Sequence, residues 1–183
     1  MRRWRCGSTY NAGALIIAGE ARRAGQDSVL RLPGGFGRPF VTIAGEDLSL
    51  DAIEHTKLRR FGDPRVHAAL VCGSVSCPTL RPEPYCGADL SAQLDNQMRR
   101  LVADGAVMVD RSAGRVGLSR IFLWYGADFV RPDRMPSFLP VGRRQVLTAL
   151  LPWMEPEEAA WIQANPSRVY FQDYDWGLAC TVK

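Results

Sequence analysis

Residues 65–80, RVHAALVCGSVSCPTL, place one histidine and two cysteines beside a run of apolar residues. The run from Val66 to Cys72 lies between Pro64 and Gly73, and this pattern predicts a buried strand. The Ser/Gly segment that follows predicts a loop carrying Cys77, and loops on a rigid scaffold often hold reactive side chains. The stretch therefore admits three readings: a reactive thiol, a metal site or an ordinary core.

The sequence on either side predicts a mixture of helices and short strands. Helices are expected at 10–24, at 50–61 with Ser49 as cap, at 90–101 with Asp89 as cap, from Ser119 to 129, near 143–151 and at 156–164. Strands are expected at 40–43, at 106–110 and 116–119 as a hairpin, and at 168–176. This order predicts an α+β fold, in which residues 1–183 form a single mixed domain with a small, largely antiparallel sheet and about six helices.

Composition limits the classes of partner. With 183 residues, of which 46% are apolar and 23% charged, the chain is expected to be soluble and to bury a core. The net charge is +4, but the arginines are spread along the chain and only Lys57 and Lys183 are lysines, so no nucleic acid partner is expected. No apolar run reaches the roughly 18 residues of a membrane span, and the N-terminus is no convincing signal peptide. Partners stay unknown, and the cytoplasm is the default location.

Zinc binding is one possible role for the cysteines. His67, Cys72, Cys77 and Cys86 have the ligand types of tetrahedral zinc. In a regular strand, however, His67 and Cys72 would point to opposite faces, so neither a metal nor another cofactor is expected. Cys72 then reads as a small buried hydrophobe, and a disulfide between Cys72 and Cys77 stays open. Five cysteines are an odd number, which argues against a secreted disulfide framework.

Two acidic side chains fall on apolar helix faces. At 100° per residue, Glu54 lies within the apolar arc formed by Leu50, Ile53, Leu58 and Phe61. Asp128 lies between Ile121 and Trp124 in the same way. A carboxylate that faces a core must be paired or hydrogen-bonded. The candidate partners are Arg65, Arg120, His55 and His67.

These residues support two hypotheses of different classes. The first is a thiol-dependent enzyme, a hydrolase or acyl transferase. Its catalytic candidates are Cys77 as nucleophile, His67 or His55 as base, and Glu54 or Asp128 as the acid that orients the base, with Arg65 holding an anionic group. The second is a non-catalytic scaffold or interaction module, in which the same polar residues form a buried structural network.

Four motifs in order resemble the domain-of-unknown-function 547 family. They are LSLDAIEH (48–55), DPRVHAALVCGSVSCPTL (63–80), LSRIFLWYGADF (118–129) and YDWGLA (174–179), and YNA (10–12) resembles the end of the family's N-terminal helix motif. The family has no established activity, so the resemblance implies fold kinship and site positions but no reaction. The implied positions are Asn11, Glu54, His55, Asp63, Arg65, His67, Cys72, Ser76, Cys77, Pro78, Trp124, Tyr125, Asp128, Tyr174, Asp175 and Trp176. Among them, Asn11, Tyr125 and Asp175 join Arg65 as candidate substrate-binding residues.

The chain departs from the family pattern at two places. The pattern is lost before Tyr10, and Ala179 stands where we expect Asn. We therefore expect an N-terminally truncated member of the family. Its first helix should still pack Ala14, Leu15, Ala18 and Ala21 on the core. Apolar surface that upstream helices cover in relatives should then be exposed and promote self-association.

Overall fold

The α+β prediction is confirmed by a computed structural model, which describes residues 5–179, with side chains from residue 8 onward. The α-helices are α1 (Arg5–Arg23), α2 (Leu50–Ala52), α3 (Val66–Ala69), α4 (Leu90–Leu101), α5 (Ile121–Trp124), α6 (Gly126–Val130), α7 (Arg143–Leu150) and α8 (Pro156–Ala164). The strands are β1 (Val41–Ile43), β2 (Glu46–Leu48), β3 (Val107–Asp110), β4 (Arg115–Leu118) and β5 (Arg168–Phe171). Within the described residues, no helix has the length and apolar character needed to span a membrane.

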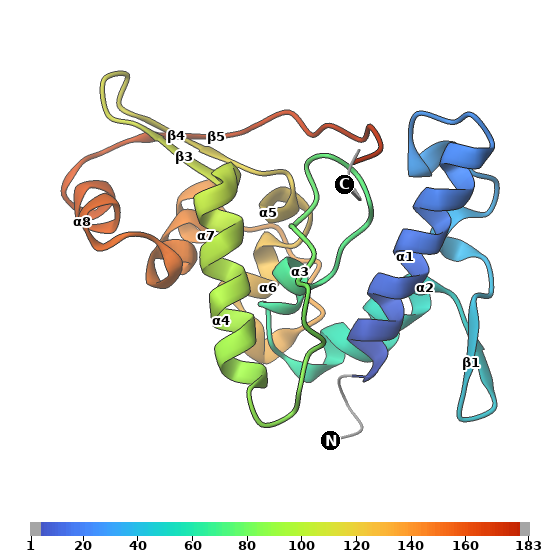
Figure 1. The fold of residues 1–183 in the computed structure, drawn as a ribbon. Coiled ribbons are helices and arrows are strands. Elements are labelled where there is room, and N and C mark those ends of the chain that lie inside the picture. The colour runs from blue at the N-terminus through green and yellow to red at the C-terminus, as the bar shows by residue number, and fades with distance from the viewer. Residues whose placement is uncertain (1–4, 180–183) are drawn as a thin grey trace.

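The strands form two small sheets. β1 and β2 are an antiparallel hairpin, and β3 and β4 are a second one, with Val109 opposite Val116. β5 returns from α8 and pairs with β4 in parallel, so that Val169 lies opposite Val116. Figure 1 shows β5 running along the β3–β4 hairpin, after which the chain continues toward α1. This return brings the YDWGLA motif beside the N-terminal helix.

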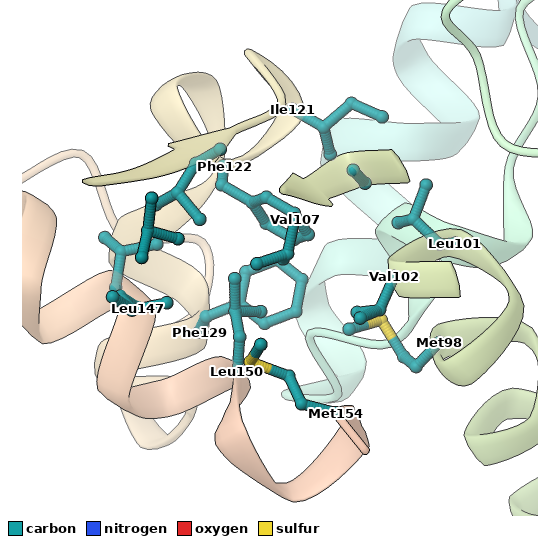
Figure 2. Close-up of a cluster of buried hydrophobic side chains, with 14 of the residues drawn as sticks. Met98, Leu101, Val102, Val107, Ile121, Phe122, Phe129, Leu147, Leu150 and Met154 are labelled. Atoms are coloured by element: carbon teal, nitrogen blue, oxygen red, sulfur yellow. The ribbon is translucent and has the colours of Figure 1, made fainter. Parts of the chain in front are cut away.

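Two large hydrophobic clusters lie on either side of the chain segment that follows α3. The N-terminal core packs α1 against the segment around α2, and its buried side chains are Tyr10, Ala14, Ile17, Val29, Leu48, Leu50, Ile53, Leu58 and Leu70. The C-terminal core joins α4, α5, α6 and α7 to the β3–β4 hairpin. In its middle, Phe122 meets Phe129 edge to face, with ring centroids 5.4 Å apart (Figure 2). Ala68 belongs to the C-terminal core and Leu70 to the N-terminal core, so residues 66–72 connect the two.

The predicted strand at 66–72 is wrong, although the segment is buried as expected. Residues 66–69 form the helical turn α3, and the chain is extended only beyond it. The hydrogen bonds that a strand would make to neighbours are made elsewhere: His67 N donates to Pro64 O, and Val71 N donates to the side chain of Asn11. Because these backbone groups already have partners, burial does not require a sheet.

The helix predicted at 50–61 is present but not uniform. Ser49 caps it as expected, since its Oγ accepts a hydrogen bond from Ala52 N at 3.0 Å. A π-helical turn at Ile53–Leu58 then lets Arg59 N bond to Glu54 O, five residues back. The wider turn brings Arg59 inward to 2% exposure and leaves Phe61 38% exposed. Phe61 was expected in the apolar arc, and that expectation is wrong because it assumed a constant 100° per residue.

Three local expectations also need correction. Leu15 is 43% exposed rather than packed on the core, because the buried face of α1 runs through Tyr10, Ala14, Ile17 and Ala21. Asp89 precedes α4 as predicted, but its side chain makes no capping hydrogen bond. The helix predicted from Ser119 is two short helices, α5 and α6, separated at Tyr125.

Two glycines of α1 provide a matched test of this packing. A Cβ on Gly13 would lie 2.7 Å from Phe40 Cε1 and 2.8 Å from Leu50 Cδ2, whereas at Gly19 the nearest atom is 3.6 Å away. Each substitution to alanine gains about 1 kcal/mol of helix propensity. At Gly13 alone, overpacking against Phe40 and Leu50 costs about 1–3 kcal/mol. We expect Gly13→Ala to lower the free energy of unfolding by about 1 kcal/mol and Gly19→Ala to raise it. Urea unfolding of both variants measures this, and a stabilised Gly13→Ala would contradict the close approach of α1 to Phe40.

Candidate functional site

A cavity of about 110 Å³, called here the site cavity, lies between the two cores. Its walls come from α1, the helical segment after α2, the chain after α3, α5 and the segment after β5. The lining residues are Tyr10, Glu54, His67, Leu70, Cys72, Cys77, Pro78, Ile121, Trp124, Tyr125, Tyr174 and Trp176. Motifs far apart in the sequence therefore meet at one place.

Asn11 positions the segment that carries the thiols. Its Nδ2 donates to Ala69 O and its Oδ1 accepts from Val71 N, both at 3.0 Å. The side chain is only 6% exposed, so these bonds satisfy two backbone groups that water does not reach. Asn11 was predicted to bind substrate, but it does not line the site cavity, and in the structure it fixes the chain just before Cys72.

The two thiols are adjacent. Cys72 N donates to Cys77 Sγ at 2.7 Å, and both cysteines are free thiols. Cys72 Sγ also lies 3.0 Å from Ser74 Oγ and 3.7 Å from the Tyr174 hydroxyl. Cys72 Sγ therefore lies beside two hydroxyl groups that can donate hydrogen bonds to it, and such bonds stabilise a thiolate.

These contacts give the two thiols different acidities. A hydrogen bond from the Cys77 thiol is the main cause that lowers the pKa of Cys72 to about 6, and bonds from Ser74 add to it against the opposing effect of burial. Burial raises the pKa of Cys77 well above its usual value, and the neighbouring Cys72 raises it further. Of the two thiols, Cys72 is therefore the more acidic.

Asp128 is the centre of a buried polar network. Its Oδ2 accepts hydrogen bonds from Arg59 Nε at 2.8 Å and from His67 Nε2 at 2.9 Å, and its Oδ1 accepts from Ser137 N at 2.7 Å. The side chain is fully buried, as expected from its place in the apolar arc. Burial raises the pKa of Asp128, but the hydrogen bonds from His67, Arg59 and Ser137 outweigh it and lower the pKa to about 2. Asp128 is therefore a carboxylate, which can only accept hydrogen bonds.

This carboxylate determines the tautomer of His67. Because Asp128 accepts, the proton must be on His67 Nε2, and burial lowers the pKa of His67 despite the opposing bond to Asp128. The neutral ring then has an unprotonated Nδ1, which lies 4.0 Å from Glu54 Oε1. Tyr125 stacks on the ring at a centroid distance of 3.9 Å and fixes its plane. His67 is thus held as a base by an acid on its other nitrogen, the arrangement that general-base catalysis needs.

Glu54 is held at the cavity wall by a tyrosine. The Tyr10 hydroxyl donates to Glu54 Oε2 at 3.1 Å. Burial and the nearby Glu54 raise the pKa of Tyr10 well above its usual value, so the tyrosine keeps its proton and remains a donor. Glu54 is therefore buried and partnered, as expected for an acid in an apolar arc, and it faces the unprotonated nitrogen of His67.

Besides Asn11 and Asp128, three further predicted site residues lie outside the site cavity. His55 is exposed on a neighbouring cavity of about 450 Å³, and its Nδ1 lies 3.4 Å from Arg59 Nη1. Arg65 pairs with Asp63 at 2.7 Å and Asp95 at 3.0 Å. Asp175 is exposed, and its Oδ1 accepts a hydrogen bond from Gly177 N. Both thiols and His67 line the site cavity, and in the described part of the chain no hydrogen bond joins a thiol to a histidine.

The sequence does not predict the roles of two residues at the site, Arg59 and Ser74. Arg59, the cation of the Asp128 network, was not considered because a uniform helix turns it away from Glu54. The sequence predicts only that Ser74 lies in a loop, but its Oγ contacts both Cys72 Sγ and the Tyr174 hydroxyl. Ser74 could have been identified from its position between the two cysteines. Arg59 could have been identified because a buried Asp128 needs a cation.

The zinc reading finds no support in the geometry. His67 and Cys72 do not lie on opposite faces of a strand, because residues 66–69 form a helical turn. Within residues 5–179, however, no three His, Cys, Asp or Glu side chains are grouped so that they could hold a metal ion.

Comparison with known proteins gives one match. The family model described as "Protein of unknown function, DUF547" matches residues 9–102, just over half of the chain. The matched range contains the two thiols, His67 and Glu54, whereas Asp128 and the aromatic residues after β5 lie beyond it. No curated protein and no solved structure matches the chain.

The acidity of Cys72 can be measured by alkylation. We expect the rate of iodoacetamide modification at Cys72 to rise with a midpoint near pH 6, because the thiolate is the reactive form. In a Cys77→Ala variant the midpoint should move up toward the usual thiol value of about 8.5, because the main stabilising hydrogen bond is removed. Peptide mass spectrometry resolves each site, with the exposed Cys86 as internal reference. If the pH midpoint of Cys72 alkylation is the same in Cys77→Ala as in the unaltered chain, the hydrogen bond between the two thiols is contradicted.

Proposed function

Because this chain belongs to the domain-of-unknown-function 547 family, for which no reaction is assigned, we propose its function from the site alone: a thiol-dependent hydrolase or acyl transferase. In this proposal Cys72, rather than Cys77, is the nucleophile. The observation that carries it is the joint presence, on one cavity, of a thiol with lowered pKa and a histidine oriented by a carboxylate.

The first step needs no base, because the nucleophile is already ionised. The Cys72 thiolate attacks the carbonyl carbon of an ester or thioester and forms an acyl thioester. The bond to the leaving oxygen or sulfur breaks, and the leaving group takes the electron pair and then a proton from solvent. Cys77 contributes the hydrogen bond that keeps Cys72 ionised and is not itself acylated.

The second step uses His67. A water molecule, or an acceptor that replaces it, loses a proton to His67 Nδ1 as it attacks the thioester carbon. The carbon–sulfur bond breaks and Cys72 leaves as a thiolate. Asp128 on Nε2 and Glu54 near Nδ1 stabilise the imidazolium that forms, which afterwards gives its proton to solvent. Cys72 and His67 both line the site cavity, and in this proposal the acceptor enters it once the leaving group has departed.

The scaffold hypothesis stays as a second candidate because of one observation. Arg59 and Asp128 are almost completely buried, and together with His67 they satisfy one another's hydrogen bonds. Such a network stabilises the packing of elements without any substrate. This network does not account for Cys72, which lines the cavity and has Ser74 and Tyr174 hydroxyls beside its Sγ.

Acetylation by p-nitrophenyl acetate separates the two candidates. We expect the full chain to release a burst of nitrophenol and to gain one acetyl group on Cys72. Cys72→Ser should abolish the burst. His67→Gln should still be acetylated but should lose its acetyl group about 100-fold or more slowly, because the base for the second step is absent.

The exposed Cys86 supplies the matched control. Cys86→Ser should leave the burst and its decay unchanged. Acetylation of Cys72 no faster than that of Cys86 would overturn the proposal and favour the scaffold. Equal decay of the acetyl group with and without the His67 side chain would remove His67 from the mechanism.

A further inference from the structure

Five aromatic side chains line the site cavity, and they come from three separate parts of the chain. They are Tyr10 of α1, Trp124 and Tyr125 at the end of α5, and Tyr174 and Trp176 after β5. Trp124 lies 4.9 Å from Tyr174 and 5.3 Å from Trp176 between ring centroids, and Tyr174 lies 4.5 Å from Trp176. The rings are tilted by 33–63° rather than stacked flat, so they form a curved wall. Aromatic faces carry partial negative charge and attract cations.

The ionisable groups around the cavity also favour a cation. The acidic residue Glu54 lines it, whereas burial lowers the pKa of His67 and favours its neutral form. Arg59 lies 5.3 Å from the Tyr125 ring centroid, but its charge is balanced by Asp128. The chain has 23 basic residues, yet no Lys or Arg of the described part lines either the site cavity or the neighbouring cavity.

The size of the cavity limits the group that it can hold. A water molecule takes up about 30 Å³ of liquid, so 110 Å³ corresponds to about four heavy atoms. A trimethylammonium group has one nitrogen and three methyl carbons. The neighbouring cavity of about 450 Å³ shares Tyr10, Glu54, Cys72, Tyr125 and Trp176 with the site cavity, so it offers space for the rest of a small molecule.

The lining distinguishes an alkylated from a simple ammonium group. A primary ammonium needs three hydrogen-bond acceptors. Glu54 is the only carboxylate on the described wall of the site cavity, and one of its oxygens already accepts from Tyr10. The Tyr125 ring already stacks on His67, but the other four rings and one carboxylate suit a cation that presents methyl groups.

We propose that the site cavity binds the alkylated ammonium group of a small substrate, whose acyl carbon then lies beside Cys72. The position of the acyl carbon rests on the proposed function. Binding of the cation rests only on the rings, the carboxylate and the absence of basic residues from the described walls. The two parts can therefore fail separately.

Choline and its neutral isostere 3,3-dimethylbutan-1-ol test the inference directly. We expect choline to bind the full chain at least tenfold more tightly, as measured by quenching of tryptophan fluorescence and by calorimetry. Glu54→Gln should weaken choline binding about tenfold and leave binding of the isostere unchanged. Trp124→Leu should also weaken choline binding, and because Trp124 is 41% exposed this change leaves the cores intact.

Glu157→Gln on the exposed surface of α8 is the matched control and should bind choline as the unaltered chain does. Equal affinity for choline and the isostere, or choline binding that Glu54→Gln and Trp124→Leu do not change, would overturn the cation site. Selective choline binding together with an unreactive Cys72 would support the cation site and reject the thiol mechanism. Acetylation of Cys72 without selective choline binding would support the thiol mechanism and reject the cation site.

Discussion

The arrangement of this protein depends on one buried charge, the carboxylate of Asp128. Arg59 and His67 come from the N-terminal part of the chain, and Asp128 and Ser137 come from the C-terminal part, so their hydrogen bonds join the two cores across the segment that follows α3. A buried carboxylate without partners would be strongly unfavourable, and removing it would leave Arg59 charged and unpaired. The packing of α6 against the π-helical turn and α3 is therefore coupled to the chemistry of the site.

In the proposed function, the same charge also prepares the base. Asp128 keeps the proton of His67 on Nε2, which leaves Nδ1 unprotonated and near Glu54. On the other side of the cavity, Asn11 fixes the chain so that Cys72 lies among Cys77, Ser74 and Tyr174. In the proposed function, an acidic thiol and a base are thus prepared by two independent sets of hydrogen bonds. Neither set needs a substrate to form, which is the preorganisation that catalysis requires.

Much of this could be predicted from sequence, and the failures have physical causes. Periodicity located most helices and the β3–β4 hairpin, and it placed Glu54 and Asp128 inside, because burial follows from the angle per residue. It failed for Arg59 and Phe61, since a π-helical turn changes that angle. It failed for residues 66–72 because Asn11, 58 residues before Ala69, replaces the partner strand. The choice between Cys72 and Cys77 depends on three-dimensional donors that spacing does not reveal.

The most direct test of the central claim is the protonation state of His67. The chain has only two histidines, so ¹⁵N nuclear magnetic resonance of labelled protein gives signals from two rings, and a His67→Gln variant assigns them. We predict a neutral His67 with its proton on Nε2 at pH 7, and a protonation midpoint below the usual histidine value of about 6.5. An Nδ1 tautomer, or an imidazolium at pH 7, would contradict this prediction, because His67 would then have no unprotonated Nδ1 to act as a base.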